Sequence, residues 1–413
     1  MNIGFFCYEY YPLLVGGLGV YAIEITKKFK EFGNEVSVFT LNDGTLNTYE
    51  VWNGIEIHRP MLVDIMEIFP LVVRDDLKRW GWNLKFFADI YTYNILSSTK
   101  FINLLIKKEK RKFDIISFHD WLSAFAGIIC KKNTKLPAVF HIHSIEEQRA
   151  LGGGSETIKE IERTAAKHAD KIITVSYSMK DFLISLGYPR EKIEVVYNGI
   201  DTEKYSIKNV NWKLVEKLKE RYKIENQIVI LFIGRLVWIK GAYNLLYSIP
   251  HVIKDFPNVK LIILGKGESF NDLLQLRQQL KLEKYVEIRS EWVSEEERIA
   301  HYALADLCVF PSINEPFGIV SLEAMSLEKP VVVGAKNVNG LKEQVIPSGE
   351  NRTGVHVNGE DPLDIAWGIK VVLSNLDEAK KWGKNGRKRV EEMFKIEYTT
   401  KKTLEIYESL LKF

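Results

Sequence analysis

Cysteine is scarce in this chain, and what little there is forms no pattern. The 413 residues contain three cysteines, Cys7, Cys130 and Cys308, which are far apart and odd in number. This spacing excludes a disulfide framework and does not match the close pairs of a zinc site. The cysteine content is therefore typical of a protein from a reducing compartment.

Long apolar segments and a strong charge bias are also missing. No apolar run reaches the ~18 residues of a membrane-spanning helix, and Met1 leads directly into an apolar strand instead of a signal peptide. The basic run 107–112 is best interpreted as a solvated helix end, although it could touch acidic lipid. The net charge of +3 is too small to indicate nucleic acid. We expect a cytoplasmic protein without stable membrane insertion and without a nucleic-acid partner.

The composition is that of a globular protein, with 46% hydrophobic and 27% charged residues. A chain of this length predicts two domains of roughly 200 residues each. Short apolar runs alternate with helical patterns, among them the predicted strands 171–176 and 192–201, and this alternation indicates parallel α/β sheets. A second such series follows a boundary near residues 200–210, so the domains are predicted at 1–205 and 206–395.

A glycine-rich junction follows the first predicted strand, MNIGFFC. Gly16, Gly17 and Gly19 precede a predicted helix over residues 20–32. Backbone amides at such a strand-to-helix junction can face an anion. The order of the glycines does not match a dinucleotide-binding fingerprint, and a plain flexible turn remains the alternative.

Polar side chains collect where two further strands end. His119, Asp120 and Trp121 close one strand, and His141 and His143 close the next. Ligands of doubly wound sheets bind outside the carboxyl ends of the strands, so these residues are site candidates. A metal site is the competing interpretation, because His141 and His143 point to one face and His119 or Asp120 could join them. No further acid or histidine completes a ligand set, and we therefore predict no metal.

In the second half, the segment GRLVWIKG places two cations around a turn after a strand. Arg235 stands just past the strand and Lys240 begins the next helix. Two cations five residues apart could hold a diphosphate from opposite sides. An ordinary surface pair is the alternative.

The segment EPFGIVSLE follows the predicted strand 307–310 and opens a helix. Gly318 permits close approach of a ligand, and the amides of Gly318 and Ile319 favour an anion. Glu315 lies before the helix and Glu323 inside it, roughly 8 Å apart along the axis at ~1.5 Å per residue. This layout suits a nucleotide-sugar, with a diphosphate in the middle and a hydroxylated ring at each end. The alternative is an N-cap acid at Glu315 and a solvated helix face at Glu323.

Taken together, these segments resemble the GT-B glycosyltransferases of the large retaining group that includes glycogen and starch synthases. EPFGIVSLE is similar to that group's E-x7-E motif, whose first Glu (here Glu315) holds donor-sugar hydroxyls and whose second (Glu323) holds the ribose. GRLVWIKG resembles the diphosphate-binding Arg and Lys of the group, here Arg235 and Lys240. VSYSM and VYNGID are further landmarks. FHDWLSAF and the HIH that ends at His143 resemble the glycogen/starch synthase branch.

The resemblance implies a GT-B fold, in which two Rossmann-like, doubly wound domains face each other across a cleft. The first domain would bind the acceptor, the second the nucleotide-sugar, and an amphipathic helix at 396–413 would pack back on the first. The implied enzyme is a hexosyltransferase that moves glucose from UDP- or ADP-glucose to an α-glucan or another saccharide, as in glycogen biosynthesis. It needs no cofactor, because the nucleotide-sugar is a substrate and no metal is required.

The implied site has three groups of residues. The catalytic group is Arg235, Lys240, Glu315 and His143. The donor-binding group is Gly16, Gly17, Phe317, Gly318, Ile319 and Glu323. The acceptor side is His119, Asp120 and Trp121.

One departure from the family bears on specificity. Bacterial and plant glycogen synthases carry a Lys before the glycine pair of the first loop, where this chain has Leu14 and Val15 before Gly16 and Gly17. Its absence leaves room for other acceptors: a small sugar, a sugar phosphate or a lipid-linked glycan. A sugar-nucleotide epimerase of the same architecture and a non-catalytic sugar-nucleotide-binding subunit are the rival classes.

Overall fold

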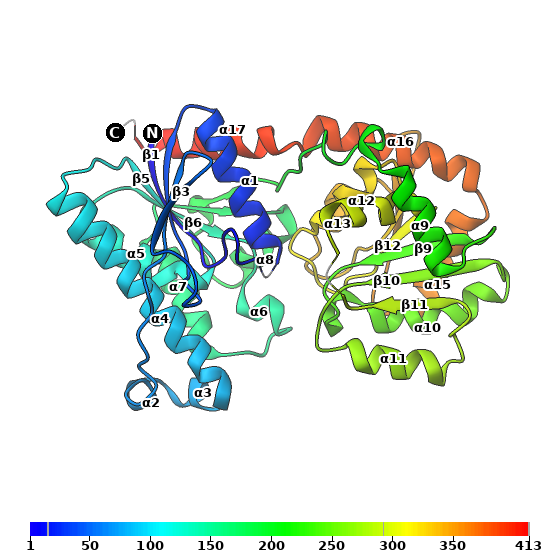
Figure 1. Ribbon diagram of the computed structural model, residues 1–413, viewed down its shortest axis with the longest axis horizontal. Helices are drawn as coiled ribbons and strands as arrows, with labels where there is room; N and C mark the ends of the chain where they lie inside the picture. Colours follow the sequence, from blue (N-terminus) through cyan, green and yellow to red (C-terminus); the bar gives the residue numbers. More distant parts are fainter. Residues whose placement is uncertain (15, 292, 412–413) are drawn as a thin grey trace. The chain divides into compact units, whose positions relative to one another are not determined.

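The structure, a computed structural model, describes residues 1–14, 16–291 and 293–411. Residues 412 and 413 of the expected terminal helix lie outside the described residues, as do Val15 and Trp292. The chain forms two compact units, each built around one sheet (Figure 1). The first unit comprises Met1–Ser176, Lys180–Asn198 and the helix that begins at Ile396; the second comprises Tyr177–Met179 and Gly199–Lys395.

The sheet of the first unit has eight strands in the order β3-β4-β2-β1-β5-β6-β7-β8. Neighbouring strands are parallel except β3 and β4, which are antiparallel. The strands are β1 (Asn2–Phe6), β2 (Glu35–Phe39), β3 (Tyr49–Trp52), β4 (Ile55–His58), β5 (Ile115–His119), β6 (Ala138–Ile142), β7 (Lys171–Thr174) and β8 (Ile193–Val195). Apolar residues fill most strand positions, as expected for a sheet covered on both faces.

Helices cover both faces of this sheet. The first and last helices of the chain, α1 and α17, pack side by side against one face, and α4, α5 and α7 cover the other (Figure 1). The helices are α1 (Gly17–Glu31), α2 (Phe69–Val72), α3 (Asp75–Lys78), α4 (Leu84–Thr99), α5 (Ala124–Thr134), α6 (Glu146–Arg149), α7 (Glu156–His168), α8 (Tyr177–Ser185) and α17 (Ile396–Ser409), with a π-helical extension of α4 at Lys100–Lys108. The C-terminal helix is thus part of the first unit.

The sheet of the second unit has six parallel strands in the order β11-β10-β9-β12-β13-β14. The strands are β9 (Ile228–Ile233), β10 (Val259–Leu264), β11 (Val286–Arg289), β12 (Leu307–Phe310), β13 (Val331–Gly334) and β14 (Gly354–Val357). The helices are α9 (Trp212–Tyr222), α10 (Ala242–Ile253), α11 (Phe270–Gln279), α12 (Glu295–Leu304), α13 (Ile319–Ser326), α14 (Leu341–Gln344), α15 (Pro362–Leu373) and α16 (Leu376–Met393). A buried core joins α10, α11 and α15 to one face, while α12 and α13 contact the strands from the other.

Each sheet reverses its winding direction at one position. In the first sheet β1 lies between β2 and β5, and in the second β9 lies between β10 and β12. Doubly wound sheets bind ligands at the carboxyl ends of the strands beside this switch point. The loops after β1, β5, β9 and β12 therefore form the expected ligand-binding edges, and these loops carry most of the predicted site residues.

The predicted fold class is confirmed: two parallel-sheet α/β domains of the doubly wound kind. Several boundaries differ from the sequence prediction, among them that of β7, which ends at Thr174 instead of residue 176. Helix α1 begins at Gly17 instead of residue 20, so the glycine pair lies at its start. The strand predicted over 192–201 ends at Val195, because the following residues leave the sheet and the backbone N–H of Ile200 bonds to the carbonyl of Phe394 in the second unit. Among the described helices, none has both the length and the apolar character that a membrane crossing requires.

Candidate active site

The segment EPFGIVSLE forms the loop after β12 and the start of α13. Gly318 precedes the helix with φ 87°, in the region that favours glycine. A Cβ atom at this position would lie 2.6 Å from Cδ2 of Leu341 and 3.0 Å from Cγ of Glu315. Both conformation and packing therefore require glycine here. The helix begins at Ile319, so its first N–H groups open at the predicted anion position.

Glu315 is buried and forms an ion pair with Lys240. The Lys240 ammonium donates to Oε2 of Glu315, and the Ser312 hydroxyl lies 3.4 Å from the same oxygen. The backbone of Glu315 pairs with the loop after β13, because its N–H bonds to Val338 and its carbonyl accepts from Gly340. Glu315 does not cap α13, whose N-cap residue is Gly318.

Lys240 and Arg235 both lie in the loop that follows β9 at the switch point. Lys240 ends the short 3-10 turn Trp238–Lys240, and Gly241 (φ 76°) leads into α10. Arg235 is exposed one residue past Gly234, whereas Lys240 is partly buried beside Glu315. The structure thus brings Lys240 and Glu315 together from the two loops that flank the switch point of the second sheet.

Glu323 is buried in the first turns of α13 and hydrogen-bonded to two tyrosines. Its carboxylate accepts from the hydroxyls of Tyr205 (2.9 Å) and Tyr302 (2.8 Å), and Arg298 lies 3.3 Å away. The carboxylate is the largest cause of the raised pKa of Arg298. With 3% of Glu323 exposed, the alternative of a solvated helix face is wrong. The three partners lie far from Glu323 in sequence, and no local motif predicted them.

At the start of α1, the glycine pair already has an acidic neighbour. The N–H of Gly16 donates to Oε2 of Glu9 at 2.8 Å, and Gly17 is the first residue of the helix. Because Glu9 belongs to the loop after β1, this loop is tied to the helix that follows it. Glu9 was not among the predicted site residues, and its position ten residues before Gly19 gave no motif that would have identified it.

Asp120 and Trp121 follow β5 and serve the protein's own structure. The carboxylate of Asp120 accepts from the backbone N–H groups of His143 (2.7 Å) and Ser144 (3.3 Å). Burial raises its pKa to about 6 against the lowering effect of Arg149. The ring of Trp121 is buried and stacks on Phe87 with centroids 5.4 Å apart. Asp120 thus fixes the backbone of His143.

The three histidines of β5 and β6 form one cluster with His143 at its more exposed end. Nδ1 of His119 lies 3.2 Å from Nε2 of His143, and the rings of His119 and His141 stack at 4.4 Å. One ligand atom from each histidine lies within 4.8 Å of the others, which is compatible with a metal by distance alone. The planes of the three rings, however, are within 17–30° of parallel. The absence of a metal at this cluster therefore stays a prediction.

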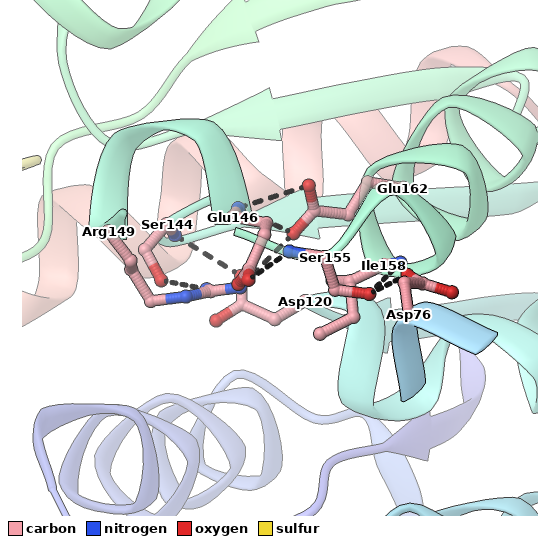
Figure 2. Close-up of polar contacts among 8 residues, drawn as sticks. All are labelled: Asp76, Asp120, Ser144, Glu146, Arg149, Ser155, Ile158 and Glu162. Atoms are coloured by element: carbon pink, nitrogen blue, oxygen red, sulfur yellow. Dashed lines mark hydrogen bonds and ion pairs between the residues drawn. The ribbon is translucent and has the colours of Figure 1, made fainter. Parts of the chain in front are cut away.

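The loop after β6 is anchored by buried acids (Figure 2). Both oxygens of Glu162 on α7 accept from the N–H of Glu146, at 3.0 and 3.1 Å. Arg149 spans the loop, donating to Ser144, Glu146 and Glu162. Burial raises the pKa of Glu162 to about 8. This network holds the segment that follows His143, and the adjacent acids of the sequence "IEEQR" were its only visible sign.

The arrangement in the second unit has the chemistry needed to bind a nucleotide-sugar. Lys240 and Arg235 supply positive charge, the start of α13 supplies N–H groups, and Glu315 supplies a carboxylate for hydroxyl groups. Fixed cations and N–H groups stabilise the charge that develops on a departing diphosphate. An ionised carboxylate has about four acceptor positions, so the three contacts of Glu323 leave one for a ligand hydroxyl.

Comparison with known proteins agrees with this chemistry. Residues 215–389 match the family model "Glycosyl transferases group 1", and residues 15–204 match "Glycosyltransferase Family 4". The chain is 32% identical to an uncharacterized glycosyltransferase of Methanocaldococcus jannaschii over 98% of both chains. It is 24% identical to a glycogen synthase of Mycobacterium tuberculosis over 98% of this chain and 94% of the relative. The fold is similar to that of sucrose-phosphate synthase from Thermosynechococcus elongatus, with a TM-score of 0.78, 20% identity and coverage of 99% and 98%.

Two doubly wound α/β units of this topology are the fold of GT-B glycosyltransferases. This chain belongs to the glycosyltransferases.

Proposed function

We propose that this glycosyltransferase is a retaining hexosyltransferase that moves glucose from UDP- or ADP-glucose to an α-glucan or another saccharide. The observation that carries the proposal is the pairing of Lys240 with Glu315 directly before the N-terminus of α13. A diphosphate bound there meets a cation and free N–H groups, and a sugar bound there meets a carboxylate. A nucleotide-sugar uses all three groups at once.

The proposed reaction breaks the bond between the anomeric carbon and the diphosphate. Arg235, Lys240 and the N–H groups of Gly318 and Ile319 stabilise the leaving oxygens most strongly in the transition state, without a metal. Glu315 holds hydroxyls of the donor sugar. Retention of configuration follows from attack on the face that the diphosphate leaves.

The remaining predicted residues complete this scheme. Glu323 accepts from the ribose, and Phe317 belongs to the same donor loop. Gly16 and Gly17 serve the donor from the loop after β1. His143 donates a hydrogen bond to the sugar and does not act as a base, because burial lowers its pKa to about 3.

The acceptor is proposed as a glucan because the glycogen synthase relative matches nearly the whole chain. The missing Lys before Gly16 supports a second candidate, a small sugar, a sugar phosphate or a lipid-linked glycan as acceptor. On the acceptor side, His119, Asp120 and Trp121 line the loops after β5 and β6 as predicted, and all three are buried.

A donor-by-acceptor screen tests the proposal. UDP-glucose and ADP-glucose are each incubated with glycogen, maltose, glucose 1-phosphate and no acceptor, and nucleoside diphosphate release and products are measured. The proposal predicts glucosyl transfer in at least one acceptor lane that is lost in Glu315→Gln. Conversion of the donor to another sugar nucleotide without acceptor would identify an epimerase, and donor binding without turnover in any lane would identify a binding subunit.

A further inference from the structure

A chain of buried hydrogen bonds runs from the C-terminal helix to His143 within the first unit. The hydroxyl of Tyr407 on α17 donates to Oγ of Ser117 at 2.8 Å, and Ser117 Oγ lies 3.0 Å from Nε2 of His119. His119 Nδ1 in turn lies 3.2 Å from Nε2 of His143. Tyr407, Ser117 and His119 are buried, and His143 is the more exposed end of the chain.

The sequence pattern explains why these groups meet. Side chains two apart on a strand share a face, so Ser117 and His119 on β5 point the same way, as do His141 and His143 around the end of β6. The two strands are paired with His119 opposite His141. This is the face that α1 and α17 cover, and α17 places Tyr407 against it.

Counting hydrogens leaves two directions for this hydrogen-bond chain, and one of them runs from His141 to His143. A hydroxyl has one hydrogen, so Tyr407, which donates to Ser117, accepts from Nε2 of His141 at 2.8 Å. Ser117 then uses its own hydrogen toward Nε2 of His119. His119 consequently carries its hydrogen on Nδ1 and donates it to Nε2 of His143. The remaining hydrogen of His143 is on Nδ1.

The buried end at His141 favours this direction over the reverse. Nδ1 of His141 is buried without a hydrogen-bond partner among the described residues. In the direction given above, that atom is an unpaired acceptor, whereas in the reverse direction it would be an unpaired N–H. Buried N–H groups without a partner are rarer and more costly than unpaired acceptors.

The chain works only with neutral rings, and its surroundings keep them neutral. Burial lowers the pKa values of His119 and His141 well below the usual range. His141 and His143 also lower the pKa of His119, and His143 lowers that of His141, because a second positive charge in the cluster would repel the first. The other titratable groups in contact are Tyr21 on α1, whose ring is 4.6 Å from that of His143, and Asp120, which binds the His143 backbone.

We propose that Tyr407, Ser117 and His119 are positioning residues that hold His143 in its Nδ1–H form, so that His143 donates a hydrogen bond to an oxygen of the bound sugar. The inference rests on the proposed function, because it assumes that His143 meets the substrate. It makes α17, the last helix of the polypeptide, a supporting part of the active site.

The test uses the full-length protein labelled with 15N in the histidine rings. Two-bond 15N–1H spectra distinguish the Nδ1–H and Nε2–H forms of each ring, and the His143 signals are assigned with His143→Gln. Kinetics with the nucleotide-sugar found in the screen give kcat and KM. Tyr10→Phe is the matched control, because Tyr10 is a buried tyrosine of the same core whose hydroxyl bonds to Thr26 at 2.7 Å, away from the chain.

The expected loss of kcat/KM increases from Tyr10→Phe through Tyr407→Phe to His119→Phe. In the wild type His143 is in the Nδ1–H form. In Tyr407→Phe the hydrogen-bond chain keeps two bonds whichever way it runs. His143 therefore populates both the Nδ1–H and the Nε2–H form, and kcat/KM falls about twofold because about half of the enzyme carries the competent form. In His119→Phe the ring of His143 loses its bond entirely, and kcat/KM falls about tenfold. Tyr10→Phe changes neither the His143 spectrum nor kcat/KM.

The outcomes separate the possibilities. A single Nδ1–H form of His143 in Tyr407→Phe, or a wild-type kcat/KM in His119→Phe, overturns the positioning role. Stoichiometric Zn²⁺ binding that shifts all three histidine signals also overturns it in favour of a metal site. If the wild type transfers glucose to none of the acceptors in the screen, the proposed function fails. The tautomer spectra of His143 then still test the hydrogen-bond chain.

Discussion

Replacing Glu323 with alanine should weaken both nucleotide binding and the second unit itself. The buried carboxylate accepts from two tyrosine hydroxyls and pairs with Arg298, which is partly exposed and also pairs with Glu295. Removing the carboxylate costs about 3–5 kcal/mol, because both tyrosine hydroxyls lose a charged acceptor and Arg298 keeps only Glu295 as an ion-pair partner. For a domain of ~200 residues each kcal/mol shifts the unfolding temperature by about 2–4 °C. The second unit of Glu323→Ala should therefore unfold roughly 6–20 °C below the wild type.

The effect on ligand binding must be separated from this loss of stability. Tyr302→Phe removes one donor to Glu323 without removing the carboxylate that we propose binds the ribose. Its unfolding temperature should fall moderately, since one hydrogen bond to a charged group is worth about 1.5–3 kcal/mol, while its affinity for a nucleoside diphosphate stays close to wild type. Glu323→Ala, measured well below its unfolding temperature, should bind the diphosphate at least tenfold more weakly.

Calorimetric titration and thermal unfolding of Glu323→Ala and Tyr302→Phe separate the effect on ligand binding from the effect on stability. Glu283→Ala is the control at an exposed position. A wild-type unfolding temperature in Glu323→Ala would refute the buried network. A wild-type affinity for UDP and ADP in the same variant would show that Glu323 has only a structural role.

Three further predictions concern charge. Lys240→Met should lower kcat about 10²–10³-fold, as expected for the loss of one group that stabilises developing charge. Lys217→Met, at an exposed position, should leave kcat unchanged. Equal kcat values for the two variants would exclude a role of Lys240 at the diphosphate. Turnover should survive excess EDTA, and loss of activity that Mn²⁺ or Mg²⁺ restores would contradict a metal-free site. The free energy of unfolding should depend less on pH in His119→Phe than in the wild type. His119 is neutral when folded and charges below pH ~6.5 when unfolded, so it contributes stability that is lost as the pH falls. Removing it should reduce the slope between pH 6 and 5 by ~1.4 kcal/mol per pH unit in urea titrations, and an unchanged slope would mean that His119 is already charged in the folded protein.

Local patterns were enough to predict both sheets and the loops at their switch points. Apolar runs separated by helical periods lead to parallel strands, and their carboxyl ends must lie at one edge of each sheet. Gly318 was identified from the sequence as a position where a ligand can approach closely, but its positive φ was not predicted. The segment containing Glu315 and the segment containing Lys240 were each identified separately, but their ion pair was not.

Partners distant in sequence could not be predicted, because they depend on how helices dock. Tyr205 and Arg298 reach Glu323 from other elements, and nothing in their local sequence marks them. The same holds for Tyr407, which looked like one apolar residue of an amphipathic helix but whose hydroxyl bonds to Ser117. One signal was visible: Ser117 and His119 break an otherwise apolar strand on a single face, and such a buried polar pair requires partners.

The anomeric configuration of the product tests the central claim most directly. The lane of the donor-by-acceptor screen that shows transfer is repeated with 13C-labelled glucose in the donor, with EDTA present, and the new glycosidic bond is examined by NMR. Retaining transfer by Lys240, Arg235 and Glu315 predicts an α-linked glucosyl product, formed without metal and absent in Glu315→Gln. A β-linked product, or a donor converted to a different sugar nucleotide, would contradict the account.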